Sequence, residues 1–241
     1  MSSAVDSPRY ERLDALRGAA IVWMVLFHFA FDLNHFGLIG RQNFYADPKW
    51  TWQRTCIVSL FLLCVGLSQA VAMQHSQPWP RFWRRWGQVA GCAVLVSIGS
   101  WWMFPKSWIS FGVLHGIAVM LILVRPAARF GRWLWIVGLL AVVLPWFVAD
   151  PIFDSRWMNW VGLVTRKPVT EDFVPVLPWF SVVCWGLAAG QWLLRSRARV
   201  LAGPAPGLRV LAVLGRWPLT IYMLHQPLLI GAIRVFKELA P

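Results

Sequence analysis

Several ionisable residues share one face of the first long apolar segment of the chain. At about 100° per residue they fall within about a quarter of the circumference of a helix, and the stripe consists of Asp14, Arg17, Met24, His28, Asp32 and His35. Ionisable groups inside a membrane span are costly and almost always face the protein interior or a wet cavity. The stripe therefore predicts an interior path, cationic at its start and lined by imidazole and carboxylate farther along.

His28 is the predicted catalytic group of this stripe. It lies about 16 Å beyond Arg17 along a helix, and Asp32 follows one turn later. A carboxylate at that spacing can hold an imidazole in one tautomer and stabilise the cation that forms when it accepts a proton, as a general base requires. The structural alternative is a His and Asp pair that only joins helices.

The composition places this segment in a membrane protein. Of the 241 residues, 58% are hydrophobic and 14% are charged, and the mean hydropathy is +0.56. About 20 apolar residues cross a bilayer, and we expect one all-α domain over residues 1–241 with about seven spans. The predicted spans are Ala19–Phe36, Trp52–Met73, Gln88–Met103, Trp108–Val124, Leu134–Val148, Val174–Leu194 and Trp217–Phe236. Only Phe104–Ser107 separates the third span from the fourth, and Leu208–Leu214 is a candidate extra turn.

With seven spans the charged joints alternate between two sides of the membrane. Most of the 23 basic residues collect on one side: Arg9, Arg12, Arg17, Arg81, Arg84, Arg85, Arg125, Arg129, Arg132, Arg195, Arg197, Arg199, Arg209 and Arg216. Most acidic residues lie on the other: Asp32, Asp47, Asp150, Asp154, Glu171, Asp172 and Glu238. Cytoplasmic joints are rich in Lys and Arg, so we expect a cytoplasmic amino terminus without a cleaved signal peptide, an external carboxyl terminus and a long external loop Asp150–Asp172.

The net charge of +13 does not indicate nucleic-acid binding, because the basic residues lie between apolar runs instead of covering one water-facing surface. Their predicted partners are lipid headgroups. The cysteines lie in apolar runs without paired metal-ligand or redox spacing, so we expect no metal site: Cys56, Cys64, Cys92 and Cys184.

Four segments carry a family resemblance. Arg12–Gly18 (RLDALRG) followed by His28 resembles the opening motif of transmembrane acyltransferases. Gly112–His115, Val176–Phe180 and Gly215–Pro227 resemble the bacterial branch of the heparan-alpha-glucosaminide N-acetyltransferase catalytic-domain family. The resemblance covers nearly the whole chain.

This resemblance implies transfer of an acetyl group from cytoplasmic acetyl-CoA to an amine or hydroxyl of a sugar or glycolipid outside the cytoplasm, across a bacterial cytoplasmic (inner) membrane. Arg17 would face the CoA phosphates, with Asp14 and Arg216 on the same cofactor side. His28 would act as general base or as a transiently acetylated nucleophile.

The chain departs from the lysosomal relatives at the predicted catalytic position. In those relatives an Asn stands where His28 stands, and the catalytic His lies in the following loop. His35 is the nearest substitute in this chain and is the alternative catalytic imidazole.

His225 and Gln226 are predicted to contact the substrate from the last span. They precede Pro227, so His225 could instead satisfy a carbonyl that this proline leaves without a donor.

Three further residues are candidate substrate contacts with structural alternatives. His115 either joins the cavity or is a satisfied core histidine. Arg54 either pairs with Asp32 or Asp47 or extends to lipid headgroups. Trp179 either stacks on a sugar ring or belongs to the aromatic belt of the membrane interface.

Two other classes of membrane protein are the rival hypotheses. In a haem or quinone protein, imidazoles on separate helices can bind the cofactor. Such a site does not require Asp14, Arg17 and Asp32 beside His28. A transporter is disfavoured because the sequence has no inverted repeat. A homo-oligomer is left open.

Overall fold

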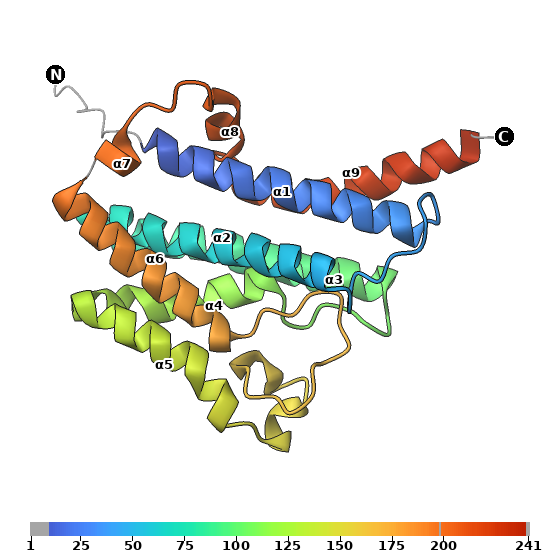
Figure 1. Cartoon of the computed structure of the whole chain (residues 1–241), viewed down its shortest axis with the longest axis horizontal. Coiled ribbons are helices and arrows are strands. Elements are labelled where there is room, and N and C mark those ends of the chain that lie inside the picture. Colours follow the sequence, from blue (N-terminus) through green and yellow to red (C-terminus); the bar gives the residue numbers. More distant parts are fainter. Residues whose placement is uncertain (1–9, 198, 240–241) are drawn as a thin grey trace. The chain divides into compact units, whose positions relative to one another are not determined.

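The computed structural model describes residues 10–197 and 199–239, and all regular secondary structure in these residues is helical (Figure 1). The prediction of an all-α protein is confirmed. The long helices are α1 (Glu11–His35), α2 (Pro48–Gln74), α3 (Trp79–Met103), α4 (Val113–Ala127), α5 (Leu134–Phe147), α6 (Val176–Ser196) and α9 (Pro218–Leu239). The short ones are α7 (Arg199–Ala202), α8 (Arg209–Leu214) and the 3-10 helices η1 (Ala128–Trp133), η2 (Pro151–Asp154) and η3 (Asn159–Val161). The extra turn predicted before the last span is α8.

In the part of the chain that the structure describes, five helical stretches are long and apolar enough to cross a bilayer, so the chain is a multi-pass membrane protein. These stretches are Glu11–His35, Pro48–Gln74, Val113–Phe147, Val176–Ser196 and Pro218–Leu239. Seven spans were predicted, and the difference arises at two places. After its arginines, α3 contains several tryptophans, glycines and serines, which lower its hydropathy. The stretch Val113–Phe147 joins two predicted spans, although Gly131 (φ 54°, ψ −120°) breaks the helical geometry between α4 and α5.

The apolar side chains of these helices largely point away from the protein interior. In the most apolar stretch of each candidate span, between 11% and 44% of the residues are buried. Large side chains such as Leu26, Leu140, Trp146 and Leu228 are exposed on helical surfaces. Water would not tolerate so much contiguous apolar surface, whereas lipid is its natural solvent.

The chain forms two compact units, and α8 and α1 belong to the first. This terminal unit contains the residues up to Ile57 and those from Trp192 onward. A Cβ atom added at Gly18 would overlap the carbonyl of Leu211, and one at Gly215 would overlap the carbonyl of Asp14. The backbones of α8 and α1 therefore approach as closely as glycine allows, and the two helices run antiparallel.

After α8 the chain turns back, and α9 runs parallel to α1 in the terminal unit (Figure 1). The rings of His28, in the second half of α1, and His225, in the first half of α9, are in contact. Near their ends, Lys237 Nζ donates a hydrogen bond to the Phe36 carbonyl at 3.2 Å. This parallel alignment brings the predicted catalytic stripe of α1 to α9.

The central unit, Val58–Gln191, contains a second close helix pair. Added Cβ atoms would overlap the α6 backbone at Gly66, the Leu63 carbonyl at Gly186 and the Ala70 side chain at Gly190. Small residues spaced four apart on both helices thus allow α2 and α6 to pack backbone to backbone, as is common in membranes. The order of these contacts shows that the two segments run parallel.

Hydrogen bonds join α3 to α4 in the central unit. Trp86 Nε1 donates to the Ala118 carbonyl at 2.9 Å, and Ser97 Oγ, farther along α3, lies 3.1 Å from His115 Nε2, nearer the start of α4. These contacts make α3 and α4 antiparallel.

The loop between α5 and α6 is held by its own acidic residues. The Val113 amide, at the start of α4, donates to Asp172 Oδ2 at 2.7 Å. Within the loop, the hydroxyl and amide of Thr165 donate to Asp154 and lower the pKa of that carboxyl. The loop is therefore an ordered part of the central unit.

Candidate active site

His28 lies in the second half of α1 with one ring nitrogen committed to the backbone. Its Nδ1 is 2.9 Å from the carbonyl oxygen of Met24. A carbonyl only accepts, so Nδ1 carries the proton and donates it, and Nε2 keeps a lone pair. The ring of Phe27 lies edge-on at a centroid distance of 5.7 Å. His28 thus has a fixed tautomer that suits a base or a nucleophile.

His225 on α9 has the same arrangement. Its Nδ1 donates to the Tyr222 carbonyl at 2.7 Å, which again leaves the lone pair on Nε2. The side chain is 8% exposed, and among the described residues Nε2 has no hydrogen-bond partner. Met223 is the residue whose carbonyl lacks its usual helical donor, because residue 227 is a proline without an N–H group. His225 does not bond that carbonyl. His225 therefore satisfies a carbonyl and also keeps a reactive nitrogen.

The two imidazoles form a direct pair. Their ring centroids are 4.9 Å apart, and their planes meet at 66°. The sequence identified His28 and His225 separately, on the first and the last predicted spans, but nothing in it paired them.

Asp32 and Gln226 lie beside this pair, one from each helix. The Gln226 side chain donates a hydrogen bond to the Asp32 carboxylate, which is 3% exposed. Asp32 Oδ2 and Gln226 Oε1 are buried and have no partner among the described residues. Two hydrogen-bond acceptors are thus unused next to the imidazoles.

The expected role of Asp32 in fixing the tautomer of His28 is not what the structure shows. Side chains of a helix lean toward its amino-terminal end. The His28 ring therefore reaches back to the Met24 carbonyl instead of forward to Asp32, which lies one turn later. Asp32 bonds Gln226 instead.

His35, the alternative catalytic imidazole, is the last residue of α1 and is exposed. Its ring stacks on Phe31 at 6.4 Å and meets Phe36 edge-on at 5.3 Å. Along the helix it lies about 10 Å beyond His28. The structure does not bring it into the imidazole pair.

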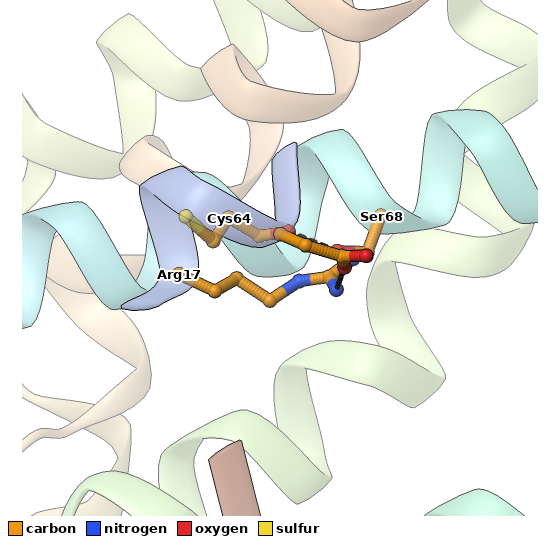
Figure 2. A network of polar contacts seen from close by, with 4 residues as sticks. Arg17, Cys64 and Ser68 are labelled. Carbon is orange, nitrogen blue, oxygen red and sulfur yellow. Dashed lines mark hydrogen bonds and ion pairs between the residues drawn. The ribbon is translucent and has the colours of Figure 1, made fainter. Parts of the chain in front are cut away.

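The three predicted cofactor residues lie at the opposite end of α1. Arg17 Nη1 is 2.6 Å from Asp14 Oδ1, which fixes the guanidinium (Figure 2). The approach of Gly215 to the Asp14 backbone places the exposed Arg216 at this same end of the helix. Figure 2 also shows Ser68, whose hydroxyl donates to the Cys64 carbonyl within α2. In the terminal unit, two arginines therefore lie on the amino-terminal side of the imidazole pair.

Arg54 does not form either of its predicted ion pairs within the described part of the chain. Asp32 bonds Gln226 and has one oxygen unpartnered. Asp47 instead accepts from the Lys49 amide at 2.8 Å and caps the start of α2. Arg54 is half-buried near that start.

His115 and Trp179 belong to the central unit. The Gly112 amide donates to His115 Nδ1 at 3.3 Å, so Nε2 carries the proton and donates to Ser97 Oγ at 3.1 Å. Nδ1 thus caps the start of α4 and Nε2 joins α4 to α3, and engagement of both nitrogens favours the structural alternative for this histidine. Trp179 is half-buried in the first turn of α6.

No sequence signal identified three partners of these histidines: the Met24 carbonyl, the Tyr222 carbonyl and the Ser97 hydroxyl. Every residue has a carbonyl, so only the fold shows which one a side chain reaches. Among residues 10–197 and 199–239 no cluster of three His, Cys, Asp or Glu side chains could hold a metal ion.

A lone-pair nitrogen on each of two contacting rings, one helical turn from a buried carboxylate, is suited to acyl and proton transfer. Comparison with curated proteins and with solved structures found no match in either set. The model of the heparan-alpha-glucosaminide N-acetyltransferase catalytic domain matches residues 9–227, which include both imidazoles. The chain belongs to this family of membrane acetyltransferases.

Proposed function

We propose that the chain moves an acetyl group from cytoplasmic acetyl-CoA to an amine or hydroxyl of an extracytoplasmic sugar or glycolipid. The family uses acetyl-CoA, and the observation that carries the proposal is the contact between His28 and His225. The whole chain, residues 1–241, acts as one acyltransferase domain of the bacterial branch of the family, in the cytoplasmic (inner) membrane.

The helix directions within each unit fit seven spans, and the charge pattern favours a cytoplasmic amino terminus. In an alternating path the first and seventh spans are parallel, the second and sixth are parallel, and the third and fourth are antiparallel. The pairs α1 and α9, α2 and α6, and α3 and α4 have these relations. The arginine-rich joints then all lie on the cytoplasmic side.

The arginines at the amino-terminal end of α1 fit the phosphates of CoA. A guanidinium binds phosphate oxygens in a bidentate manner and stays charged. Asp14 orients Arg17, and Arg216 adds a second cation. The acyl thioester of a donor held there would extend along α1 toward His28, about 16 Å away.

In this proposal His28 is the catalytic residue of the acetyl transfer. Its Nε2 lone pair attacks the thioester carbonyl or removes the proton of the acceptor, while the Met24 carbonyl prevents the ring from turning. The Asp32 carboxylate, on the same face one turn away, stabilises the positive charge that forms on the ring.

The geometry of the imidazole pair disfavours the haem alternative. Axial ligands of a haem lie on opposite faces of the porphyrin. The rings of His28 and His225 are in edge contact at 4.9 Å, which leaves no room for a porphyrin between them.

The test is acetyl transfer by purified protein in lipid nanodiscs, with acetyl-CoA and a panel of amino sugars, followed as release of free CoA. His28→Asn retains a donor for the Met24 carbonyl but lacks the Nε2 lone pair. We expect it to lose at least about 100-fold in turnover while its thermal unfolding stays near wild type.

His75→Asn, in the joint after α2, is the matched control and should keep full turnover. Unchanged turnover in His28→Asn together with loss in His35→Asn would transfer the role to His35. Absence of acetyl transfer to any acceptor by the wild-type protein would contradict the proposed function.

A further inference from the structure

The imidazole pair offers two free lone pairs, one on each ring. Both Nδ1 protons are donated to backbone carbonyls, of Met24 and Tyr222, so neither ring can use that nitrogen as a base. Each ring is therefore limited to its Nε2. Acetyl transfer through a covalent intermediate has two tasks, to carry the acetyl group and to accept the proton of the acceptor.

A single imidazole cannot perform both tasks at once in this site. After acetylation the Nε2 of His28 has no lone pair, and its Nδ1 still carries a proton. The attacking amine or hydroxyl must give its proton to another group. The described group in direct ring contact with His28 that has a free, buried lone pair is His225 Nε2.

We propose that His28 carries the acetyl group and that His225 is the separate catalytic base of the second half-reaction. This division of labour rests on the proposed function and adds to it a residue with a distinct chemical role.

The first step forms a bond from His28 Nε2 to the acetyl carbon and breaks the bond from that carbon to sulfur. CoA leaves as the thiolate, and His28 becomes an acetylated cation because its Nδ1 proton remains. In the second step the acceptor oxygen or nitrogen bonds to the acetyl carbon, the bond to Nε2 breaks, and the acceptor proton passes to His225 Nε2. His225 then returns this proton to the thiolate or to water, which leaves free CoA and the acetylated acceptor.

The charges in the site support this order of events. The pair carries one positive charge at a time, first on His28 and then on His225, which avoids the repulsion between two adjacent imidazolium ions. The Asp32 carboxylate and the Tyr222 phenol are the other titratable groups that flank the pair from α1 and α9. Asp32 is held by the neutral Gln226 amide, so its negative charge is available to offset the migrating positive charge.

The experiment separates the two half-reactions. Exchange of labelled CoA into acetyl-CoA without acceptor requires only the first step, whereas acetyl transfer requires both. His225→Asn keeps a donor for the Tyr222 carbonyl and removes the Nε2 base. We expect exchange near the wild-type rate in this variant and loss of transfer by at least about 100-fold, whereas His28→Asn loses both.

His225→Ala with added imidazole is the second variant, in which transfer should recover with imidazole concentration while exchange stays constant. Acetylated peptide containing residue 28 should accumulate in His225→Asn and be absent in His28→Asn. Equal loss of exchange and transfer in both His225 variants, without rescue, would overturn the proposal. Transfer by the wild-type protein without CoA exchange would also overturn this proposal, but it would leave the acetyltransferase function intact. A wild-type protein inactive in both assays would instead contradict the proposed function.

Discussion

Asp32 is a buried carboxylate whose identified side-chain partner is a neutral amide. Its exposed fraction is 3%, and one of its oxygens is unpartnered among the described residues. A buried carboxylate without a cation is costly. It becomes favourable when a positive charge forms nearby, which the reaction at His28 would provide.

Replacement of Asp32 by Asn should keep the packing and remove the charge. Turnover should fall at least about tenfold, since loss of ~1.4 kcal/mol of stabilisation of the transition state changes a rate by that factor. Glu238→Gln, an exposed carboxylate on α9, is the matched control and should behave as wild type. Unchanged turnover in Asp32→Asn would remove the electrostatic role of Asp32.

At the scale of residues, the sequence indicated candidate residues of the site but not the contacts that they make. The stripe on α1 identified His28 and Asp32 because an ionisable residue in an apolar helix is conspicuous. The Met24 carbonyl took the place expected for Asp32, since the direction of a helical side chain decides which neighbour it reaches. The contact with His225 depends on the packing of two helices, which one sequence does not specify.

The elements of the central unit depend on small residues where α2 meets α6. Gly186 faces the Leu63 carbonyl, and Gly190 faces Ala70. Membrane helices gain little from hydrophobic burial against lipid, so close backbone approach is a main source of their association.

Gly186→Leu should destabilise this helix pair by about 1–3 kcal/mol or more, because a side chain at this position must displace backbone atoms. The measurement is thermal unfolding in detergent micelles, with a lower midpoint expected. Gly91→Leu on α3 is the control, since nothing lies within 4 Å of its added Cβ. Equal midpoints for the two variants would contradict the proposed role of the small residues.

At the scale of elements, hydropathy located the helices but not all their ends. The first predicted span began at Ala19, whereas α1 begins at Glu11. A helix can continue into water through charged residues, which hydropathy does not register as part of a span. The break at Gly131 lies in the joint predicted between Val124 and Leu134, but the sequence did not single out this glycine, because its effect depends on a backbone conformation that glycine permits but does not impose.

For the whole molecule, the proposed seven spans and the positive-inside pattern predict which joints face each side. The joints α2 to α3 and α6 to α7 are predicted to be cytoplasmic. Those between α3 and α4 and between α5 and α6 are predicted to be external. A path with fewer spans would place some of these joints on the opposite side.

Single cysteines at exposed positions test this arrangement with a membrane-impermeant maleimide. Lys106→Cys and Ser155→Cys should react in intact cells, and Ser76→Cys and Ser196→Cys only after permeabilisation. The unmodified chain gives the background from its four native cysteines. Labelling of positions 76 and 106 from the same side would exclude α3 as a span.

The pairing of α1 with α9 also has a consequence for the making of the protein. His28 is synthesised early and His225 late, so a nascent chain that has inserted α1 through α6 still lacks one of the two rings. No product of interrupted translation before α9 can assemble the pair. Chains that lack α9 would therefore not complete acetyl transfer, and the activity would begin only after α9 has been synthesised and inserted beside α1.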